Sequence, residues 1–101
     1  MKYLIVGSGK RAENHIIPSL INLHAEIFIF GRNAKKTREL SSIYKISLLE
    51  DLSKLPHNLD GIILSIPSES IISLIITLLD NKDNYDFKKI VLYLDTPIIG
   101  P

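Results

Sequence analysis

The sequence contains no cysteine among its 101 residues and only three histidines. A chain without cysteine can form neither a disulfide nor a thiolate zinc site, so no metal centre is expected. An excess of charge of one sign is also lacking, because 12 Lys and Arg stand against 11 Asp and Glu. Nucleic-acid-binding domains usually carry a strong basic excess, which argues against DNA or RNA as a partner.

A membrane-spanning run is missing as well. The most apolar stretch, residues 61–79, is interrupted by Pro67 and Glu69, whereas a membrane span needs about 20 consecutive apolar residues. The first seven residues include only a short apolar run and lack the cleavage site of a signal peptide. We therefore expect a cytoplasmic protein with no membrane partner.

The length of the chain limits its organisation. A chain of this size forms one domain, residues 1–101, and suits a binding module better than an enzyme that needs a second, substrate-holding domain. The sequence ends soon after its last apolar run. We therefore expect the N-terminal part of a longer two-domain polypeptide, and we do not expect the chain alone to turn over a substrate.

Short apolar runs alternate with segments of helical length. The runs are rich in Ile, Val, Phe and Tyr and span residues 2–6, 26–30, 62–66 and 90–94. Uninterrupted runs of this kind predict parallel strands covered on both faces. The segments between them, which predict helices, span residues 10–23, 34–43, 50–55 and 70–81, and residues 46–48 predict a further short strand.

Strand alternating with helix predicts right-handed βαβ units. The expected fold is an α/β Rossmann-type doubly wound parallel sheet, with strand order 3-2-1-4-5 between two layers of helices. The predicted helix 70–81 is apolar except for a narrow stripe at Ser73, Thr77 and Asp80. We expect the sheet and neighbouring helices to cover it nearly all round, with a docking surface for another domain as the alternative. Pro18 is expected to bend or break the first helix.

A glycine-rich turn follows the first predicted strand directly and matches Gly-x-Gly-x-x-Ala. The first glycine permits a tight turn, the second lets a pyrophosphate approach the backbone, and the small third residue allows close helix packing. The helix N-terminus then offers free N–H groups to phosphates. The predicted cofactor contacts here are Gly7, Ser8, Gly9, Lys10, Arg11 and Ala12. The alternative is a glycine turn that binds no dinucleotide.

The second predicted strand is followed by Gly31, Arg32 and Asn33. NAD-preferring domains place an Asp or Glu on the ribose 2′-hydroxyl near this point, and the acid is absent. A guanidinium at Arg32 suits a 2′-phosphate, to which Asn33 could donate a hydrogen bond. Further cations are expected at the same edge, namely Lys10, Arg11, Lys35, Lys36 and Arg38. NADP(H) is therefore favoured as cofactor, with NAD(H) still compatible.

These features resemble the N-terminal NAD(P)-binding domain of the Gfo/Idh/MocA oxidoreductases over essentially the whole chain. The residues that carry the resemblance are Gly7-x-Gly9, His15, Pro18, Leu20, the run 59–67 and Asp95-Thr96-Pro97. The resemblance implies a sugar, sugar-nucleotide or polyol substrate bound through a C-terminal domain. It also implies that Ser65, Ile66 and Pro67 line the nicotinamide side. Association with further copies of the chain is compatible with this reading.

The catalytic lysine of that family is missing, because its Glu-Lys-Pro reads Asp95-Thr96-Pro97. Threonine cannot replace an ammonium as a general acid or base, so no catalytic residue is assigned. One alternative is therefore a non-catalytic nucleotide-sensing or scaffolding module. Another is a domain of the shikimate-dehydrogenase type, which the turn at residues 30–33 also resembles. We rank it lower because those proteins place their substrate domain first, whereas Met1 here directly precedes the first strand.

Overall fold

The computed structural model describes residues 1–66, 68–80 and 91–94. In chain order the elements are β1 (Lys2–Val6), the π-helical turn η1 (Ala12–Ile16), α1 (Ile17–Asn22), β2 (Glu26–Phe30), α2 (Ala34–Tyr44), β3 (Ser47–Leu48), β4 (Gly61–Leu64), α3 (Ser68–Asp80) and β5 (Val91–Leu94). The strands form one parallel sheet in the order β3-β2-β1-β4-β5. The predicted Rossmann-type fold and strand order are confirmed.

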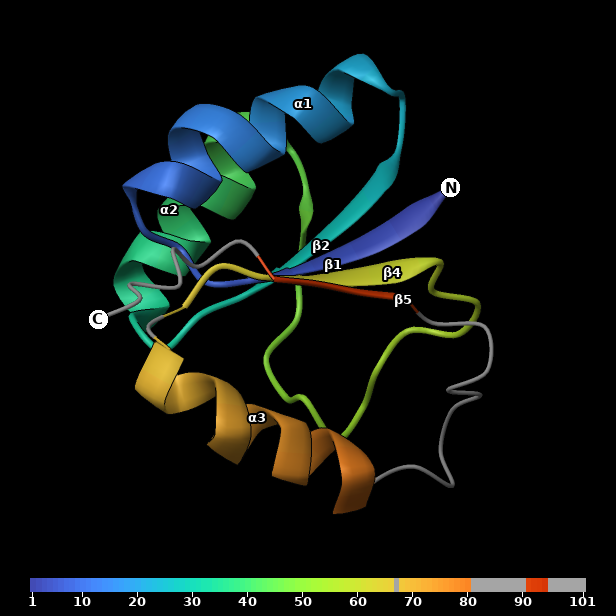
Figure 1. Ribbon diagram of the computed structural model, residues 1–101. Helices are drawn as coiled ribbons and strands as arrows, with labels where there is room; N and C mark the ends of the chain where they lie inside the picture. The colour runs from blue at the N-terminus through green and yellow to red at the C-terminus, as the bar shows by residue number, and fades with distance from the viewer. Residues whose placement is uncertain (67, 81–90, 95–101) are drawn as a thin grey trace, which may run out of the picture.

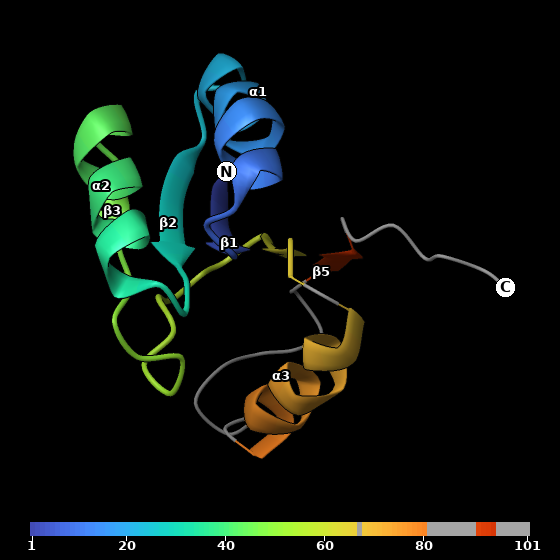
Figure 2. The ribbon, with the colours of Figure 1, turned by 90° about the vertical axis from the view of Figure 1, so that its left-hand side faces the viewer.

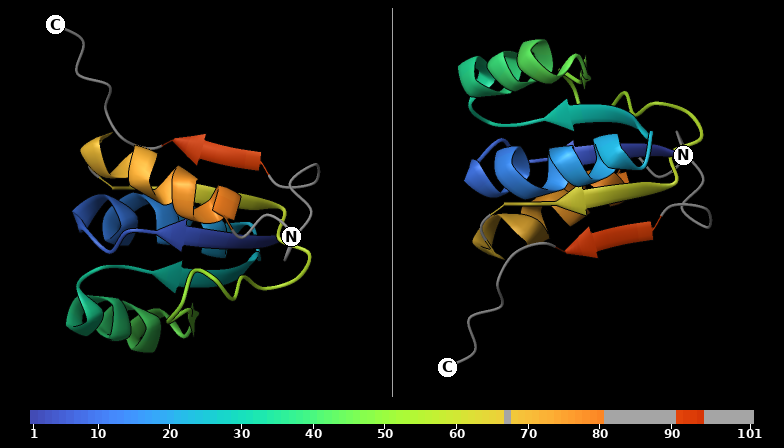
Figure 3. Two further views of the ribbon diagram at one scale, coloured as in Figure 1. Left: turned by 90° about the horizontal axis from the view of Figure 1, so that it is seen from below. Right: turned by 90° about the horizontal axis from the view of Figure 1, so that it is seen from above.

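The sheet lies between two layers of helices. Figures 1 and 2 show α1 and α2 on one face and α3 on the other, and Figure 3 shows the strands running in the same direction. Each face has its own apolar core, because alternate strand residues point to opposite sides. On β1, for example, Leu4 and Val6 belong to the core on the α3 side, whereas Ile5 belongs to the core under α1 and α2.

The first helix changes from π-helical to α-helical hydrogen bonding just before Pro18, and it does not end there. Helical structure begins at Lys10, and the N–H of Ile17 bonds the carbonyl oxygen of Ala12, five residues earlier. Pro18 follows this π-helical turn directly, as the second residue of α1, and has no N–H to donate to a carbonyl oxygen of the preceding turn. The Ser19 hydroxyl donates to the carbonyl oxygen of His15 at 2.7 Å. The helix therefore continues to Asn22 without a break.

The predicted helix at residues 50–55 is wrong, because this segment is irregular. The Asp51 carboxylate accepts hydrogen bonds from the backbone N–H of Ser53 at 2.9 Å and from its hydroxyl at 2.8 Å. Bonds of this local kind compete with helix formation, and Pro56 disfavours the helical conformation at the residue before it. The same two bonds, the backbone one first, lower the pKa of the Asp51 carboxyl below its ordinary value.

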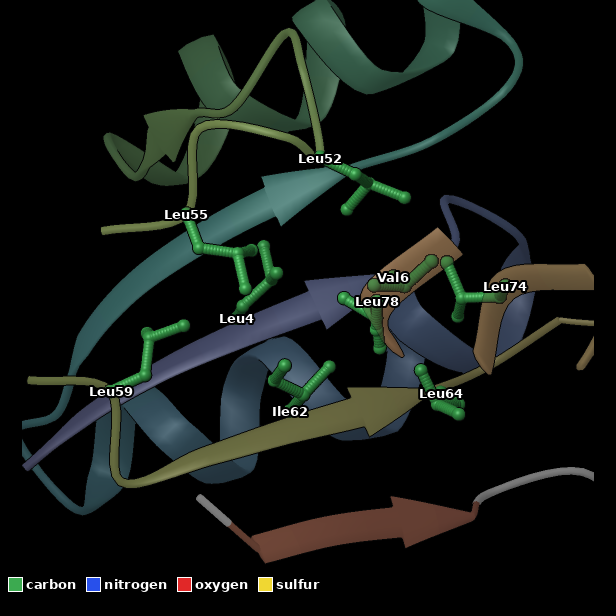
Figure 4. Packing of buried hydrophobic residues seen from close by; sticks show 9 residues of the cluster. All are labelled: Leu4, Val6, Leu52, Leu55, Leu59, Ile62, Leu64, Leu74 and Leu78. Carbon is green, nitrogen blue, oxygen red and sulfur yellow. The ribbon is translucent and has the colours of Figure 1, made fainter. Parts of the chain in front are cut away.

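The irregular β3–β4 connection, residues 49–60, covers the sheet with side chains in place of a helix. Leu52, Leu55 and Leu59 are buried in the same core as Leu74 and Leu78 of α3. Figure 4 shows these leucines on one side of the sheet. Burying a leucine contributes about 1.5–3 kcal/mol, so the three anchors stabilise a connection that lacks helical hydrogen bonds.

The expectation that α3 is covered nearly all round is also wrong. Leu74 and Leu78 are buried, but Ile72 and Ile76 are 69% and 53% exposed. Only α3 covers its face of the sheet as a helix (Figure 2), so one side of it meets no neighbouring helix among the described residues. None of the described helices combines the length and the apolar character needed to cross a membrane.

Candidate functional site

A cleft opens at the carboxyl ends of β1 and β2, and α3 forms its opposite wall. The order of the sheet reverses at β1, because the chain passes from β1 outward to β2 and β3 and then returns to β4 on the other side. Ligands of open α/β sheets bind at such a switch point. The cleft encloses about 170 Å³ and is lined by Val6, Gly7, Phe30, Gly31, Arg32, Leu52, Ile66, Ser70, Ser73, Leu74 and Thr77.

Gly7 is the point where the loops after three strands meet. Its φ of +125° is a conformation that side-chain-bearing residues rarely adopt, and a Cβ there would overlap the carbonyl oxygen of Ser65. The N–H of Gly7 donates to the carbonyl oxygen of Phe30 at 2.7 Å, and the N–H of Ser65 donates to that of Val6 at 2.8 Å. The glycine at position 7 is therefore required by the protein itself.

Gly9 differs from Gly7, because the protein does not need a glycine there for space. A Cβ built on Gly9 meets no described atom within 4 Å, and its φ lies outside the left-handed region. Its carbonyl oxygen accepts the first helical hydrogen bond, from the N–H of Glu13 at 3.1 Å. The open space lies where the sequence predicts a pyrophosphate. Lys10 and Arg11 are exposed beside it, and Ala12 is fully buried.

Gly31 brings the loop after β2 against the glycine turn. A Cβ on Gly31 would overlap the Thr37 hydroxyl and lie 2.8 Å from the Ser8 hydroxyl oxygen. Thr37 is buried, and its hydroxyl donates to the carbonyl oxygen of Asn33 at 2.7 Å. The two loops predicted to contact a cofactor are therefore in direct contact with each other.

Arg32 and Asn33 differ in their contacts with the rest of the protein. Arg32 is exposed and lines the cleft. Asn33 caps α2, because its Oδ1 accepts a hydrogen bond from the backbone N–H of Lys36 at 3.0 Å. Its amide Nδ2 carries the donors that remain for a ligand.

The cations predicted to gather beside Arg32 converge only in part. The Lys36 ammonium lies 3.0 Å from the Glu13 carboxylate, and the Arg38 Nε donates to the carbonyl oxygen of Ala34 in its own helix at 3.3 Å. Lys35 is exposed on α2. Lys36 and Arg38 thus have contacts within the protein, and Arg32 remains the cation that lines the cleft.

The far wall of the cleft comes from residues that the sequence analysis did not assign to a site. Ser70, Ser73 and Thr77 face the cleft from α3, and Leu52 reaches it from the β3–β4 connection. The Thr77 hydroxyl donates to the carbonyl oxygen of Ser73 at 3.1 Å. A signal was present, because hydroxyls at positions 70, 73 and 77 recur at helical spacing after β4.

The remaining predicted residues are placed as follows. Ser65 and Ile66 are half-buried after β4, and Ile66 lines the cleft. Pro67, Asp95, Thr96 and Pro97 lie outside the described residues. His15 is exposed on η1.

Comparison with known proteins supports a dehydrogenase-type domain. Residues 1–95 match a family model described as Shikimate / quinate 5-dehydrogenase. The fold is similar to the crystal structure of Synechocystis arogenate dehydrogenase, with a TM-score of 0.70 and 21% sequence identity. That match covers 90% of this chain and 31% of the arogenate dehydrogenase chain. No curated protein matches the sequence.

The family match corrects the resemblance to the Gfo/Idh/MocA oxidoreductases. It gives no support to a sugar, sugar-nucleotide or polyol substrate, and it favours the alternative drawn from the turn at residues 30–33. The residues that carried the resemblance, among them the glycine turn and the run 59–67, include positions that the fold itself requires. Gly7 and Ser65, for instance, are in contact whatever the substrate.

Proposed function

Because the chain belongs to the shikimate / quinate 5-dehydrogenase family, we propose that it is the cofactor-binding domain of a dehydrogenase and takes NADP(H) in preference to NAD(H). The observation that carries the proposal is the cleft at the switch point, bounded by the glycine turn, the loop after β2 and α3. When bound, the nicotinamide would accept or donate a hydride.

The pyrophosphate is assigned to the turn around Gly9. The space beside its Cα is open, and the helix that begins at Lys10 directs its first N–H groups toward that turn. Ser8, Lys10 and Arg11 provide the remaining contacts in this proposal. The donors are backbone groups of a structured helix, so little ordering is needed when the phosphates arrive.

The adenosine half is assigned to the cleft between the loop after β2 and α3. Leu52 and Leu74 give apolar walls suited to a flat base, and the Ser73 hydroxyl offers a donor and an acceptor at its edge. Gly31 lines the cleft where the ribose is assigned, and Arg32 and Asn33 would contact the 2′-phosphate. The absence of a carboxylate directly after β2 favours the phosphorylated cofactor.

The nicotinamide half is assigned to the segment after β4, where Ser65, Ile66 and Pro67 follow the strand. Ser65 is fixed by its backbone bond to Val6, and Ile66 provides apolar contact. We propose that the substrate of the dehydrogenase is of the shikimate or quinate type, as the family description suggests. No residue of this chain is assigned to catalysis.

The proposal is tested by calorimetric titration of the 101-residue chain with NADPH and NADH at low and moderate salt. We expect NADPH to bind more tightly and its binding to weaken with salt, because exposed cations are screened. Binding of NADH alone would refute the cofactor preference. Failure of both dinucleotides to bind would refute the cofactor-binding role and favour the scaffolding alternative.

A further inference from the structure

The ion pair between Glu13 and Lys36 joins the two helices that follow the loops assigned to the phosphates. The Lys36 Nζ lies 3.0 Å from the Glu13 Oε1, and the two side chains are 36% and 27% exposed. Glu13 lies one helical turn after Gly9, whose carbonyl oxygen its N–H contacts. Lys36 lies in the first turn of α2, directly after the loop that contains Arg32. Each partner therefore lies within about one helical turn, along the chain, of one of the two loops assigned to the phosphates.

The position of Lys36 gives it a choice of anionic partners. Its backbone N–H donates a hydrogen bond to the Asn33 side chain at 3.0 Å. This bond ties the backbone of Lys36 to the residue that directly follows Arg32. A lysine side chain is long and flexible and carries a compact charge, so it can swing between neighbouring anions. In the structure the Lys36 ammonium is paired with the Glu13 carboxylate. A 2′-phosphate beside Arg32 would compete for the same ammonium.

We propose that Glu13 is a positioning residue that sets the cofactor preference of this domain, by holding Lys36 away from the 2′-phosphate and neutralising its charge. The inference rests on the proposed cofactor-binding role. Arg32 then recognises the 2′-phosphate without help from Lys36, and the preference for NADPH over NADH is smaller than the local excess of cations suggests. Loss of the Glu13 carboxylate frees Lys36 and increases that preference.

An ion pair that only stabilises the packing of the two helices would give a different result. The pair also connects the first helix to α2, so breaking it would change stability or loop position. Such a change acts on the shared parts of NADPH and NADH alike. The ratio of their dissociation constants isolates the 2′-phosphate, because this group is the only difference between the two cofactors.

The test is a double-mutant cycle of Glu13→Gln and Lys36→Gln, with both cofactors titrated at low and moderate salt. We expect Glu13→Gln to raise the NADPH preference about two- to fivefold, the range that a partly exposed ion pair supports. Adding Lys36→Gln should remove that gain. In the wild-type background, Lys36→Gln should lower the preference much less than Arg32→Gln does.

Asp80→Asn is the matched control, because it removes one negative charge from an exposed position at the far end of α3. We expect it to leave the NADPH-to-NADH ratio unchanged, and circular dichroism verifies that every variant folds. A Glu13→Gln variant with an unchanged or reduced NADPH preference overturns the inference while leaving the cofactor-binding role intact. A wild-type chain that binds neither dinucleotide overturns both.

Discussion

Alanine at position 7 is expected to lower the stability of the domain, whereas alanine at position 9 is expected to weaken cofactor binding with little effect on stability. At position 7 the new methyl group would overlap the Ser65 carbonyl, and the φ of +125° disfavours any L side chain. Backbone strain of this kind costs about 1–3 kcal/mol, and forcing extra volume into a packed position costs about 1–3 kcal/mol more. Gly7→Ala should therefore lower the free energy of unfolding by about 2–6 kcal/mol, a large part of the ~5–15 kcal/mol typical of whole proteins.

At Gly9 the same methyl group meets no described atom within 4 Å. Alanine is a poorer residue than glycine before a helix, but it also restricts the unfolded chain, so the two effects largely offset each other. Gly9→Ala should change the free energy of unfolding by less than about 1 kcal/mol. It should weaken NADPH and NADH binding by tenfold or more, because about 1.4 kcal/mol of lost phosphate contact suffices for that factor.

Urea unfolding and calorimetric titration of both variants measure the two effects separately. Gly9→Ala binding both cofactors as the wild type does would refute the assignment of the pyrophosphate to this turn. An unchanged unfolding midpoint for Gly7→Ala would refute the close contact between the turn and the segment after β4.

Three further predictions concern recognition, packing and pH. Arg32→Gln should weaken NADPH binding by about 1.5–3 kcal/mol and leave NADH binding unchanged; equal losses in titrations would contradict the 2′-phosphate assignment. Leu59→Ala should lower the free energy of unfolding by about 2–5 kcal/mol, whereas the 66% exposed Ile43 should tolerate alanine in the same urea assay. The lowered pKa of Asp51 means that its bonds to Ser53 contribute stability above the unfolded pKa of about 3.9 and lose it as the pH falls through the folded pKa. The stability difference between wild type and Asp51→Asn should therefore shrink below about pH 4, and a constant difference down to pH 2 would count against this.

The sheet could be predicted from the sequence because its signals are local. The runs at β1 and β2 are unbroken apolar segments, and both strands have the predicted bounds. The order of the strands followed from their alternation with helices. The helix predicted at 50–55 failed because Leu52 and Leu55 have helical spacing, while side-chain bonds from Asp51 and the following proline decide the backbone.

The candidate site was only half predictable. The glycine turn and the loop after β2 could be predicted from the sequence, because special backbone conformations need particular residues. The wall formed by Ser70, Ser73 and Thr77 could not, since a polar stripe on a helix has the same sequence pattern whether it faces water or a cleft. The pairing of Lys36 with Glu13 is similarly a matter of how two helices pack.

The β3–β4 connection is the part of the described domain that we expect to open as a separate unit. Its backbone is anchored at its ends by bonds from Leu49 to Ile29 and from Asp60 to Lys2, each 2.8 Å long. Between these points the leucine anchors and a 2.9 Å hydrogen bond from the Lys2 ammonium to the His57 carbonyl oxygen hold it, and none of these contacts requires a helix to unwind when the segment opens. Because Leu52 also lines the cleft, a ligand that binds only the closed form shifts the population toward closure. Cofactor occupancy and amide hydrogen exchange in this segment are thereby thermodynamically linked.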